Sequence, residues 1–407
     1  MEHTAASTMP LPDDALREIL LRVSTDVAAL FRCGITCKRW GRLIADRSFL
    51  RRCWPENAAA GSSLLLGFFQ EDCPKDRPPF FSPTLPGSVF GSHRRSLTTF
   101  VSGVPAGVLN KATPIAARHG LLLVRHTATG QLVVCDTLAG GCVVVLPPLN
   151  CGAPHYGYAI LTREDCCPSD GHQGPTAATG YPAFFKVLGI IGEAHGYSLS
   201  TFISSGTNWS SSRKCFGSVW AHGKRHIWII LGTNKVVVCR GVAHWLGTYS
   251  ADQGGMARFF TFGVNAGTGQ ISIADLPIPA NQLAKPSCSG PMLSLDGNGR
   301  LSLLHLRNED LRLSMWTRVD EGTWLRAVVI ELKQPKQAWH FGCVSMRSGK
   351  KRNTLLITDF FGRIHETDIE TGAMEDVTTK MFQDEICPTA VPMEIDWPTL
   401  FSSRLSS

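Results

Sequence analysis

Apolar residues near the N-terminus recur at the spacing of one helix face. Leu16, Ile19, Leu20 and Val23 occupy positions i, i+3, i+4 and i+7, so they share one side of a helix. The acidic pair Asp13-Asp14 precedes them, where the helix dipole favours negative charge. The pattern therefore predicts a first helix that ends near Val23.

Two further segments show the same periodicity, each with four apolar residues on one face. They are Val27, Leu30, Phe31 and Ile35 in the second segment, and Cys37, Trp40, Leu43 and Ile44 in the third. The capping residues Ser24-Thr25-Asp26 separate the first helix from the second. A turn from Asp46 to Phe49 then leads into a short basic helix, Leu50-Arg51-Arg52.

The apolar content of these helices is large for their length. A segment of about 40 residues is at or below the size that folds without a disulfide, a metal or a partner. Left exposed, its apolar faces would form an aggregation-prone patch. Two interpretations follow: a helical subdomain packed against the rest of the chain, or a helical module that completes its core on another protein.

Beyond about residue 110 the pattern changes to short apolar runs separated by turn residues. Most runs contain four to eight residues rich in Val, Ile, Phe and Leu, and long helical periodicity is absent, which predicts an all-β body. The expected strands are Leu121–Val124, Gln131–Cys135, Val143–Leu146, Phe184–Ile191, Ser218–Ala221, Ile227–Leu231, Lys235–Cys239, Val242–Leu246, Phe259–Phe262, Ile271–Ile273, Leu301–Leu306, Leu311–Thr317, Leu325–Ile330, Trp339–Val344, Leu355–Thr358 and Ile364–Ile369.

A weak internal repeat refines the architecture of this body. A strand, a glycine-containing turn and a second strand recur around Cys135–Gly141, Phe262–Gly269 and Thr367–Gly372. Hairpins repeated at intervals of tens of residues indicate propeller blades, about six of them. A β-sandwich is the alternative, but a single sandwich of about 290 residues would be unusually large.

Three segments interrupt the regular pattern. Leu64–Phe69 predicts a buried strand, and the Pro- and Gly-rich residues 70–96 that follow predict a long connection. Residues 163–180 predict an exposed polar insertion, and Ser402–Ser407 a frayed tail. The expected domains are therefore residues 8–54 (helical), 55–110 (strand and connection) and 111–400 (all-β).

Composition narrows the function classes. Of the 407 residues, 43% are hydrophobic and 18% charged, as in a globular protein. The net charge is +7, but the basic residues do not form a stripe interleaved with aromatics. This argues against binding of nucleic acid. No secretory signal and no run of 18 apolar residues is present. The expectation is a cytoplasmic or nuclear protein whose 14 cysteines are reduced.

The sequence offers no positive case for catalysis or a cofactor. It contains no Gly-x-Ser-x-Gly elbow, no phosphate-binding loop and no dinucleotide-binding turn. No C-x-x-C pair is present, and His222 and His226 enclose a turn-like Gly-Lys-Arg rather than a helix turn, so no metal site is predicted. Tryptophans near the strands, among them Trp209, Trp245 and Trp316, are expected to pack blades rather than contact ligands.

The N-terminal motif resembles the F-box, particularly that of plant, grass-type proteins. The resemblance rests on Leu-Pro, an apolar helix face and a Cys-Lys-Arg-Trp-x-x-Leu-Ile run, in this order within about 42 residues. It implies that a Skp-type adaptor of a cullin ubiquitin ligase binds this segment. The candidate adaptor-facing or core positions are Leu11, Pro12, Leu16, Ile19, Leu20, Leu30, Cys37, Trp40, Leu43 and Ile44.

Two residues depart from the F-box pattern. Gly34 lies inside the second helix, where glycine costs about 1 kcal/mol relative to alanine. Ser24-Thr25 stands where related sequences often have proline. Both departures are expected to weaken local order.

The resemblance extends to the β body, whose strand-turn pattern looks like the F-box-associated β-propeller of plant proteins. It implies a non-catalytic substrate receptor that binds the adaptor, and through it a cullin, with its helical domain and an unknown protein target with its β domain. Two alternatives remain open. One is an F-box scaffold that sequesters a partner without degrading it, and the other is a propeller enzyme with a site in the central channel.

Overall fold

The computed structural model describes residues 11–54, 63–72, 77–84, 93–99, 101–102, 104, 107–149, 155–166, 184–193, 196–210, 213–214, 226–228, 236–250, 258–278, 291–296, 299–307, 309–320, 323–333, 343–348, 354–359, 363–378, 386–387 and 389–405. They belong to two compact units. One unit is helical and joins the N-terminal segment up to Ser62 with the C-terminal segment from Asp396. The other unit, Ser63–Ile395, is built of sheets.

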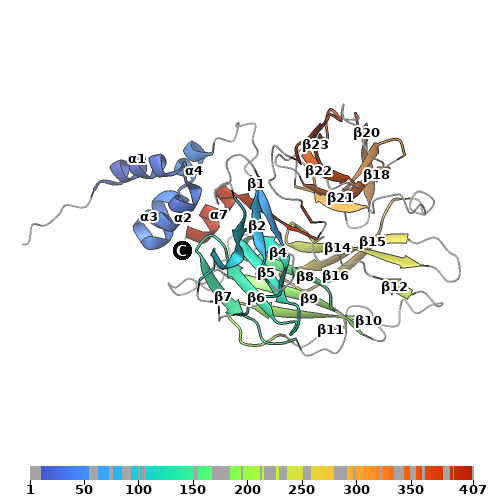
Figure 1. Cartoon of the computed structure of the whole chain (residues 1–407), viewed down its shortest axis with the longest axis horizontal. Coiled ribbons are helices and arrows are strands. Elements are labelled where there is room, and N and C mark those ends of the chain that lie inside the picture. The colour runs from blue at the N-terminus through green and yellow to red at the C-terminus, as the bar shows by residue number, and fades with distance from the viewer. Residues whose placement is uncertain are drawn as a thin grey trace, which may run out of the picture. The chain divides into compact units, whose positions relative to one another are not determined.

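The helical unit draws its helices from both ends of the chain (Figure 1). Asp26 and Asp46 each begin a helix by accepting backbone N–H groups that have no partner within the helix. The three helices predicted from the apolar periodicity are confirmed, whereas the turn expected from Asp46 to Phe49 is wrong beyond Asp46, because the fourth helix already begins at Arg47. The described helices of this unit are α1 (Asp13–Val23), α2 (Val27–Thr36), α3 (Lys38–Ala45), α4 (Arg47–Cys53) and α7 (Trp397–Leu405).

The second unit is a six-blade β-propeller of antiparallel sheets. Blade 1 contains β1 (Ser63–Gln70), β2 (Phe80–Pro83), β3 (Arg95–Ser96) and β25 (Val391–Asp396); blade 2 contains β4 (Ala112–Arg118), β5 (Leu121–His126), β6 (Leu132–Asp136) and β7 (Gly141–Val145); blade 3 contains β8 (His155–Thr162), β9 (Phe185–Glu193), β10 (Gly196–Ile203) and β11 (Arg213–Lys214). A short helix, α5 (Arg163–Cys166), follows β8, and a 3-10 turn, η1 (Leu97–Thr99), follows β3.

The remaining blades continue in chain order. Blade 4 contains β12 (His226–Trp228), β13 (Val237–Cys239), β14 (Val242–Ser250), β15 (Arg258–Asn265) and β16 (Ile271–Asp275); blade 5 contains β17 (Met292–Leu295), β18 (Leu301–Arg307), β19 (Arg312–Arg318) and β20 (Trp324–Glu331); blade 6 contains β21 (Cys343–Ser348), β22 (Thr354–Asp359), β23 (Ile364–Asp368) and β24 (Met374–Asp376). In blade 4 both β12 and β13 pair with β14, so this strand position is occupied in two pieces.

The two ends of the propeller sequence meet in blade 1. Here β25 lies beside β1 in a sheet that otherwise comes from residues before 97. The buried Gln70 side chain fastens this junction, because its Oε1 accepts the N–H of Cys387 at 2.8 Å and its Nε2 donates to Ser82 Oγ at 3.0 Å. The ring is thus closed by hydrogen bonds between strands from opposite ends of the unit.

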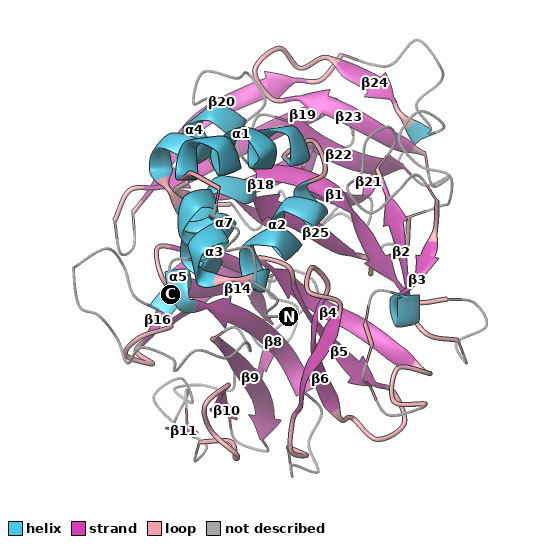
Figure 2. Cartoon of the chain, turned by 90° about the vertical axis from the view of Figure 1, so that its left-hand side faces the viewer, coloured by secondary structure: helices cyan, strands magenta, loops and turns pink. Residues whose placement is uncertain are grey.

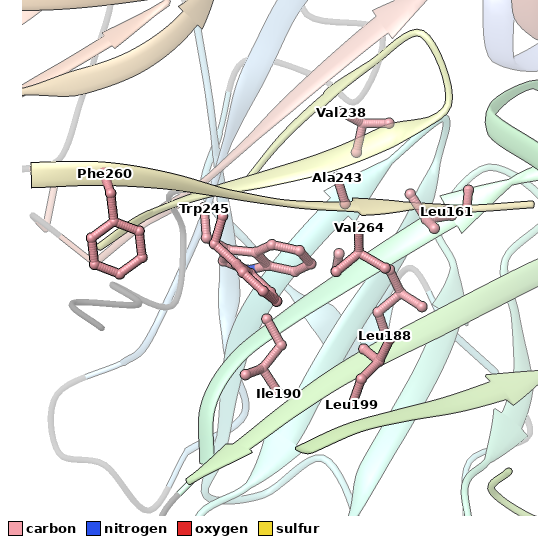
Figure 3. Packing of buried hydrophobic residues seen from close by; sticks show 12 residues of the cluster. Leu161, Leu188, Ile190, Leu199, Val238, Ala243, Trp245, Phe260 and Val264 are labelled. Carbon is pink, nitrogen blue, oxygen red and sulfur yellow. The ribbon is translucent and has the colours of Figure 1, made fainter. Parts of the chain in front are cut away.

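Neighbouring blades share apolar cores. Between blades 3 and 4, the buried Trp245 and Phe262 meet Leu188 and Ile190 (Figure 3). Similar clusters join blades 2 and 3, blades 4 and 5, and blades 5 and 6. A further cluster joins blade 6 to blade 1. Because these clusters link consecutive sheets around the ring, the alternative of a β-sandwich is wrong.

An ion pair adds to the contact between blades 2 and 3. Arg118 at the end of β4 donates from Nε and Nη2 to the carboxylate of Asp165 in α5, at 3.2 and 2.6 Å. The same carboxylate accepts the backbone N–H of Thr162 at 3.0 Å. A two-pronged arginine contact of this kind fixes geometry as well as charge.

The repeated hairpins of the sequence occupy equivalent positions. Each joins the third and fourth strands of its sheet, in blades 2, 4 and 6. Each begins with Asp or Asn, whose side chain accepts two backbone N–H groups of the turn, and ends four residues later with a glycine of positive φ. The pairs are Asp136 and Gly140, Asn265 and Gly269, and Asp368 and Gly372. The weak repeat is therefore one turn used three times.

Some expectations fall elsewhere. The strand expected at Leu64–Phe69 is confirmed as β1, whereas residues 70–96, expected as a connection, contain β2 and β3, which are also strands of blade 1. The frayed tail predicted from Ser402 is wrong as far as Leu405, because these residues belong to α7. Ser218–Ala221, residues 229–231, most of Trp339–Val344, His222, and the larger part of the insertion at 163–180 lie outside the described residues.

The repeated turn allows a comparison of two glycines. At Gly269, φ is +67° and a Cβ would meet nothing within 4 Å, whereas at Gly372, φ is +69° and a Cβ would lie 2.4 Å from the carbonyl oxygen of Glu331. We expect Gly269→Ala to cost about 1–2 kcal/mol from backbone strain alone. Gly372→Ala should cost at least about 1 kcal/mol more, because the backbone of blade 5 must move. Chemical denaturation of both variants measures the difference, and equal losses would contradict it.

A buried histidine makes the propeller sensitive to acid. Burial, reinforced by the positive charge of Arg318, lowers the pKa of His244 on β14 from 6.5 to about 4. As the pH falls from 6.5 towards 4, the unfolded chain therefore binds a proton that the folded chain does not. We expect this to remove about 3 kcal/mol from the free energy of unfolding, with no further loss below pH 4.

Denaturation between pH 7 and 4 tests this expectation. His244→Gln should flatten the pH dependence, leaving the part due to His305, whose pKa burial also lowers. The exposed His93 provides the matched control, His93→Gln. An unchanged pH dependence in His244→Gln would contradict the assignment.

Candidate functional site

The structure separates the ten candidate residues of the helical unit into core and surface. Core positions are Leu16, Leu20, Leu30, Leu43 and Ile44, all buried. Surface positions are Leu11 and Ile19, whose exposed fractions are 52% and 46%, together with exposed Pro12 and Cys37 and half-buried Trp40. The first set holds the helices together, so only the second set is available to a partner.

Arg39 fixes the start of this surface. Its guanidinium donates from Nε and Nη2 to Asp13 Oδ1, at 2.9 and 2.7 Å, and also to the backbone carbonyl of Leu11. The Leu11-Pro12 segment is thereby tied to α3, next to Trp40 in the sequence. The groups are solvent-exposed, so the contact contributes little to stability. Its effect is to fix the position of the exposed Leu11-Pro12 segment.

Two further residues shape the surface. Cys37 is the N-cap of α3, and its Sγ accepts the N–H of Trp40 at 3.5 Å. This contact gives Cys37 a local structural role. Ile35 on α2 has an exposed fraction of 39%. It was expected on the apolar face of the second helix but was absent from the candidate list. The sequence does indicate this exposure, because Ile35 lies at the end of the helix, beyond the residues of that face that contact the core.

The core of the helical unit is completed by the C-terminal helix. Trp397, Leu400, Phe401 and Leu405 of α7 are all buried, and α7 packs against α2, α3 and α4 (Figure 2). Phe401 lies among three aromatic rings, with centroids 5.9 Å from Phe31, 5.5 Å from Trp54 and 6.2 Å from Trp397. The surplus of apolar surface on the N-terminal helices is therefore covered in part by the chain itself.

Gly34 has a purpose that the sequence did not reveal. A Cβ at this position would lie 2.4 Å from Cδ1 of Leu405, and one at Gly41 would lie 3.0 Å from the carbonyl oxygen of Gly34. The two glycines let α2, α3 and α7 approach closely. The expectation that Gly34 only weakens local order is incomplete. Its low helix propensity is offset because the missing side chain leaves space for the side chain of Leu405.

Comparison with known proteins identifies the helical segment. Residues 10–52 match the family model of the F-box domain, so this segment is an F-box domain. No curated protein matches the chain significantly. Figure 1 thus shows an F-box domain, drawn in blue, and a β-propeller in one chain.

Solved structures that resemble the chain do so only distantly. The "Dos1 propeller" has 7% identity and a TM-score of 0.36, with 77% of this chain and 68% of that one covered. A eukaryotic initiation factor has 13% identity and a TM-score of 0.27 (81% and 98% covered). A post-proline cleaving enzyme from Rickettsia typhi has 9% identity and a TM-score of 0.33 (93% and 59% covered). At these scores none of them bears on function.

An F-box domain followed by a β-propeller fits the architecture of a substrate receptor of an SCF-type ubiquitin ligase. F-box domains generally bind Skp-type adaptors, and a propeller offers a broad scaffold for a second partner. Among the helices that the structure describes, none has the length and apolar character needed to cross a membrane.

The contact between Gly34 and Leu405 predicts that the effect of Gly34→Ala on stability changes sign when Leu405 is replaced by alanine. In the natural chain, Gly34→Ala gains about 1 kcal/mol of helix propensity but pushes against Leu405, and overpacking of this kind costs about 1–3 kcal/mol. We expect a net loss of stability, or no gain. In the Leu405→Ala background the obstacle is gone, so Gly34→Ala should stabilise the F-box domain by up to about 1 kcal/mol.

Hydrogen exchange of the α2 amides in the four proteins of this cycle measures the coupling. The matched control is Gly107→Ala, a glycine with open space around its Cβ position but a positive φ, in the other unit. It should show the same effect in both backgrounds. Additive effects of Gly34→Ala and Leu405→Ala would contradict the proposed packing of Leu405 on Gly34.

Proposed function

We propose that this protein is a substrate receptor of an SCF-type cullin ubiquitin ligase, with the F-box domain bound to a Skp-type adaptor. The observation that carries the proposal is the match of residues 10–52 to the F-box domain. The apolar surface that remains after α7 has covered part of the core supports it. That surface comprises Leu11, Pro12, Ile19, Ile35 and Trp40.

The residues proposed to contact the adaptor differ from the full candidate list. Leu16, Leu20, Leu30, Leu43 and Ile44 support the surface from inside the domain. Leu11 and Ile19 are the strongest contact candidates, because their exposed fractions, 52% and 46%, exceed the 39% of Ile35. Exposing aliphatic side chains of this size to water costs free energy, and burial against a partner recovers it.

In this proposal the chain brings two proteins together and performs no chemistry itself. The adaptor connects the F-box domain to a cullin, and the propeller binds a protein target. Because both partners are bound to one chain, the effective concentration of one near the other is set by the length and stiffness of the segments that join the two binding surfaces. The proposal places the protein in the cytoplasm or nucleus, where its partners act.

Substitution at Ile19 tests the adaptor surface without disturbing the core. Ile19→Asp places a charge on an exposed side chain, so the thermal midpoint should change little, whereas affinity for a Skp-type adaptor should fall at least about 30-fold, as for a hot-spot residue. The matched control is Ile203→Asp on β10, where the isoleucine has an exposed fraction of 37%. Titration calorimetry with purified adaptor measures both.

The intact protein is the reference in this experiment. Failure of the natural chain to bind any Skp-type adaptor would overturn the proposed function. Full binding by Ile19→Asp would leave the F-box intact but refute the placement of its contact surface.

A further inference from the structure

The outer edges of the six blades differ in length. In five blades the last strand has two to five described residues: β3, β7, β11, β16 and β24. The last strand of blade 5, β20, has eight, and among the described strands its partner is β19 alone. Short outer strands protect a sheet from unwanted pairing. Strand β20 lacks this protection, and Figure 2 shows it at the outer end of its sheet.

This long edge also carries most of the exposed large apolar side chains described in the propeller. Six such side chains are described there, and four of them lie on β20 or on the turn before it. They are Leu325 (56% exposed), Val328 (45%), Val329 (41%) and Val319 (52%), against Ile203 and Leu295 elsewhere. Scattered apolar residues need no explanation, but a cluster on an open strand edge marks an interaction surface.

The hydrogen bonds show which main-chain groups of β20 are open. The N–H of Leu332 donates to the carbonyl of Leu311 at 2.9 Å, so the alternate residues Ile330 and Val328 also direct their N–H groups to β19. Val329, at an intervening position, directs its N–H away from the sheet, whereas the backbone of Glu331 lies against the turn at Gly372 of blade 6. Open main-chain groups in this arrangement can accept one more strand.

The other half of β20 is open in the same way. The N–H of Val319 donates to the carbonyl of Thr323 at 3.0 Å, so by the same alternation Trp324 and Arg326 have their main-chain groups on the open side. The ladder skips Ala327, since Val328 pairs with Met315 and Arg326 with Trp316. The bulge leaves open positions on both sides of it.

The two faces of this edge have different chemistry. Leu325 and Val328 lie on the face shared with Met315 and Leu313, as their pairing shows. Arg326 lies on the opposite face with Trp316, and its guanidinium carbon is 6.0 Å from the centroid of that ring. Val329 also lies on the face of Arg326, because it pairs with Ser314. A side chain of a partner strand would therefore meet only aliphatic carbon on the face of Leu325 and Val328, and a positive charge beside Val329 on the other.

Arg326 is exposed and has no carboxylate partner among the described residues. Arg318 of β19, which pairs with Trp324, donates to the backbone carbonyl of Asp320 at 3.0 Å. By contrast, Arg312 at the end of β19 is paired with Glu331 at 2.7 Å. Among the described residues, the guanidinium of Arg326 is thus left without a carboxylate partner, which favours an acidic side chain in a bound strand.

We propose that β20 binds an extended segment of a partner protein as an added strand, with an acidic side chain beside Arg326 and aliphatic side chains beside Leu325 and Val328. Main-chain bonds to Val329 and Arg326 supply affinity, and the alternation of acidic and aliphatic side chains supplies specificity. Identifying this partner with the ubiquitylation target rests on the proposed function. The binding itself does not require the adaptor.

The test uses the full chain and a fluorescein-labelled octapeptide in which glutamate alternates with valine and threonine, followed by fluorescence anisotropy. Its counterpart with lysine in place of glutamate tests the charge. We expect saturable, salt-weakened binding of the acidic peptide and at least ten-fold weaker binding of the lysine peptide. Equal binding of both peptides, or of neither, would overturn the proposal.

Two matched pairs of variants locate the site. Val329→Pro and Val329→Ala both remove the valine side chain, but only proline removes the open N–H without breaking a bond to β19. We expect binding by Val329→Pro to be at least ten-fold weaker than by Val329→Ala. Arg326→Glu should weaken the acidic peptide at least five-fold, whereas Arg163→Glu, at an exposed arginine on α5, should not.

Three controls make the result decisive. Circular dichroism melting confirms that the variants are folded, and a variant that does not fold is replaced by Arg326→Glu as the deciding one. Light scattering measures the oligomeric state: a dimer that dissociates in Val329→Pro would show that a second copy occupies the edge and would overturn the proposal. Adaptor affinity, unchanged in all these variants, separates failure of this inference from failure of the proposed function.

Discussion

The packing of the C-terminal helix onto the F-box helices is the contact on which the rest of this structure depends. Four short helices from residues 13–53 have more apolar surface than they can bury among themselves, and α7 supplies the missing side. Phe401 forms the centre of this contact, within 6.2 Å of three other aromatic ring centroids. Burying aromatic rings removes large apolar areas from water. The helical unit is therefore discontinuous in sequence, and the surface that its F-box domain leaves exposed is what α7 does not cover.

The same stretch of chain serves both units. Residues 391–396 form β25, which closes the propeller beside β1, and α7 begins at the next residue. The strand that closes the ring is therefore joined directly, without an intervening loop, to the helix that packs on the aromatic core of the helical unit. Closure of a ring by strands distant in sequence has an entropic cost, because a long loop must be brought together. Here the cost is offset by the Gln70 hydrogen bonds and the shared cores between blades.

Two kinds of surface result from this arrangement. The F-box domain has isolated exposed aliphatic residues held in place by buried neighbours and by Arg39. Among its described strands, the propeller has short outer strands in five blades and one long outer strand, β20, in blade 5. For the proposed receptor, we infer binding by side-chain burial at the first surface and by main-chain pairing at the second.

The sequence by itself determined the elements that depend on local patterns. Helix periodicity placed α1 to α3, capping residues placed the break at Asp26, and the alternation of apolar runs and turns predicted most strands. The turn after Asp136, Asn265 and Asp368 was visible because its hydrogen bonds are local. Only the tertiary structure decided the rest. It separated Leu16 from Ile19 as core and surface, turned residues from Ser402 to Leu405 from an expected tail into part of a core, and gave Gly34 its role as the seat of Leu405. The first outcome depends on how α1 packs against α2 and α3, and the other two depend on contacts between residues hundreds of positions apart. Burial created by such contacts leaves no periodic signal in either segment alone.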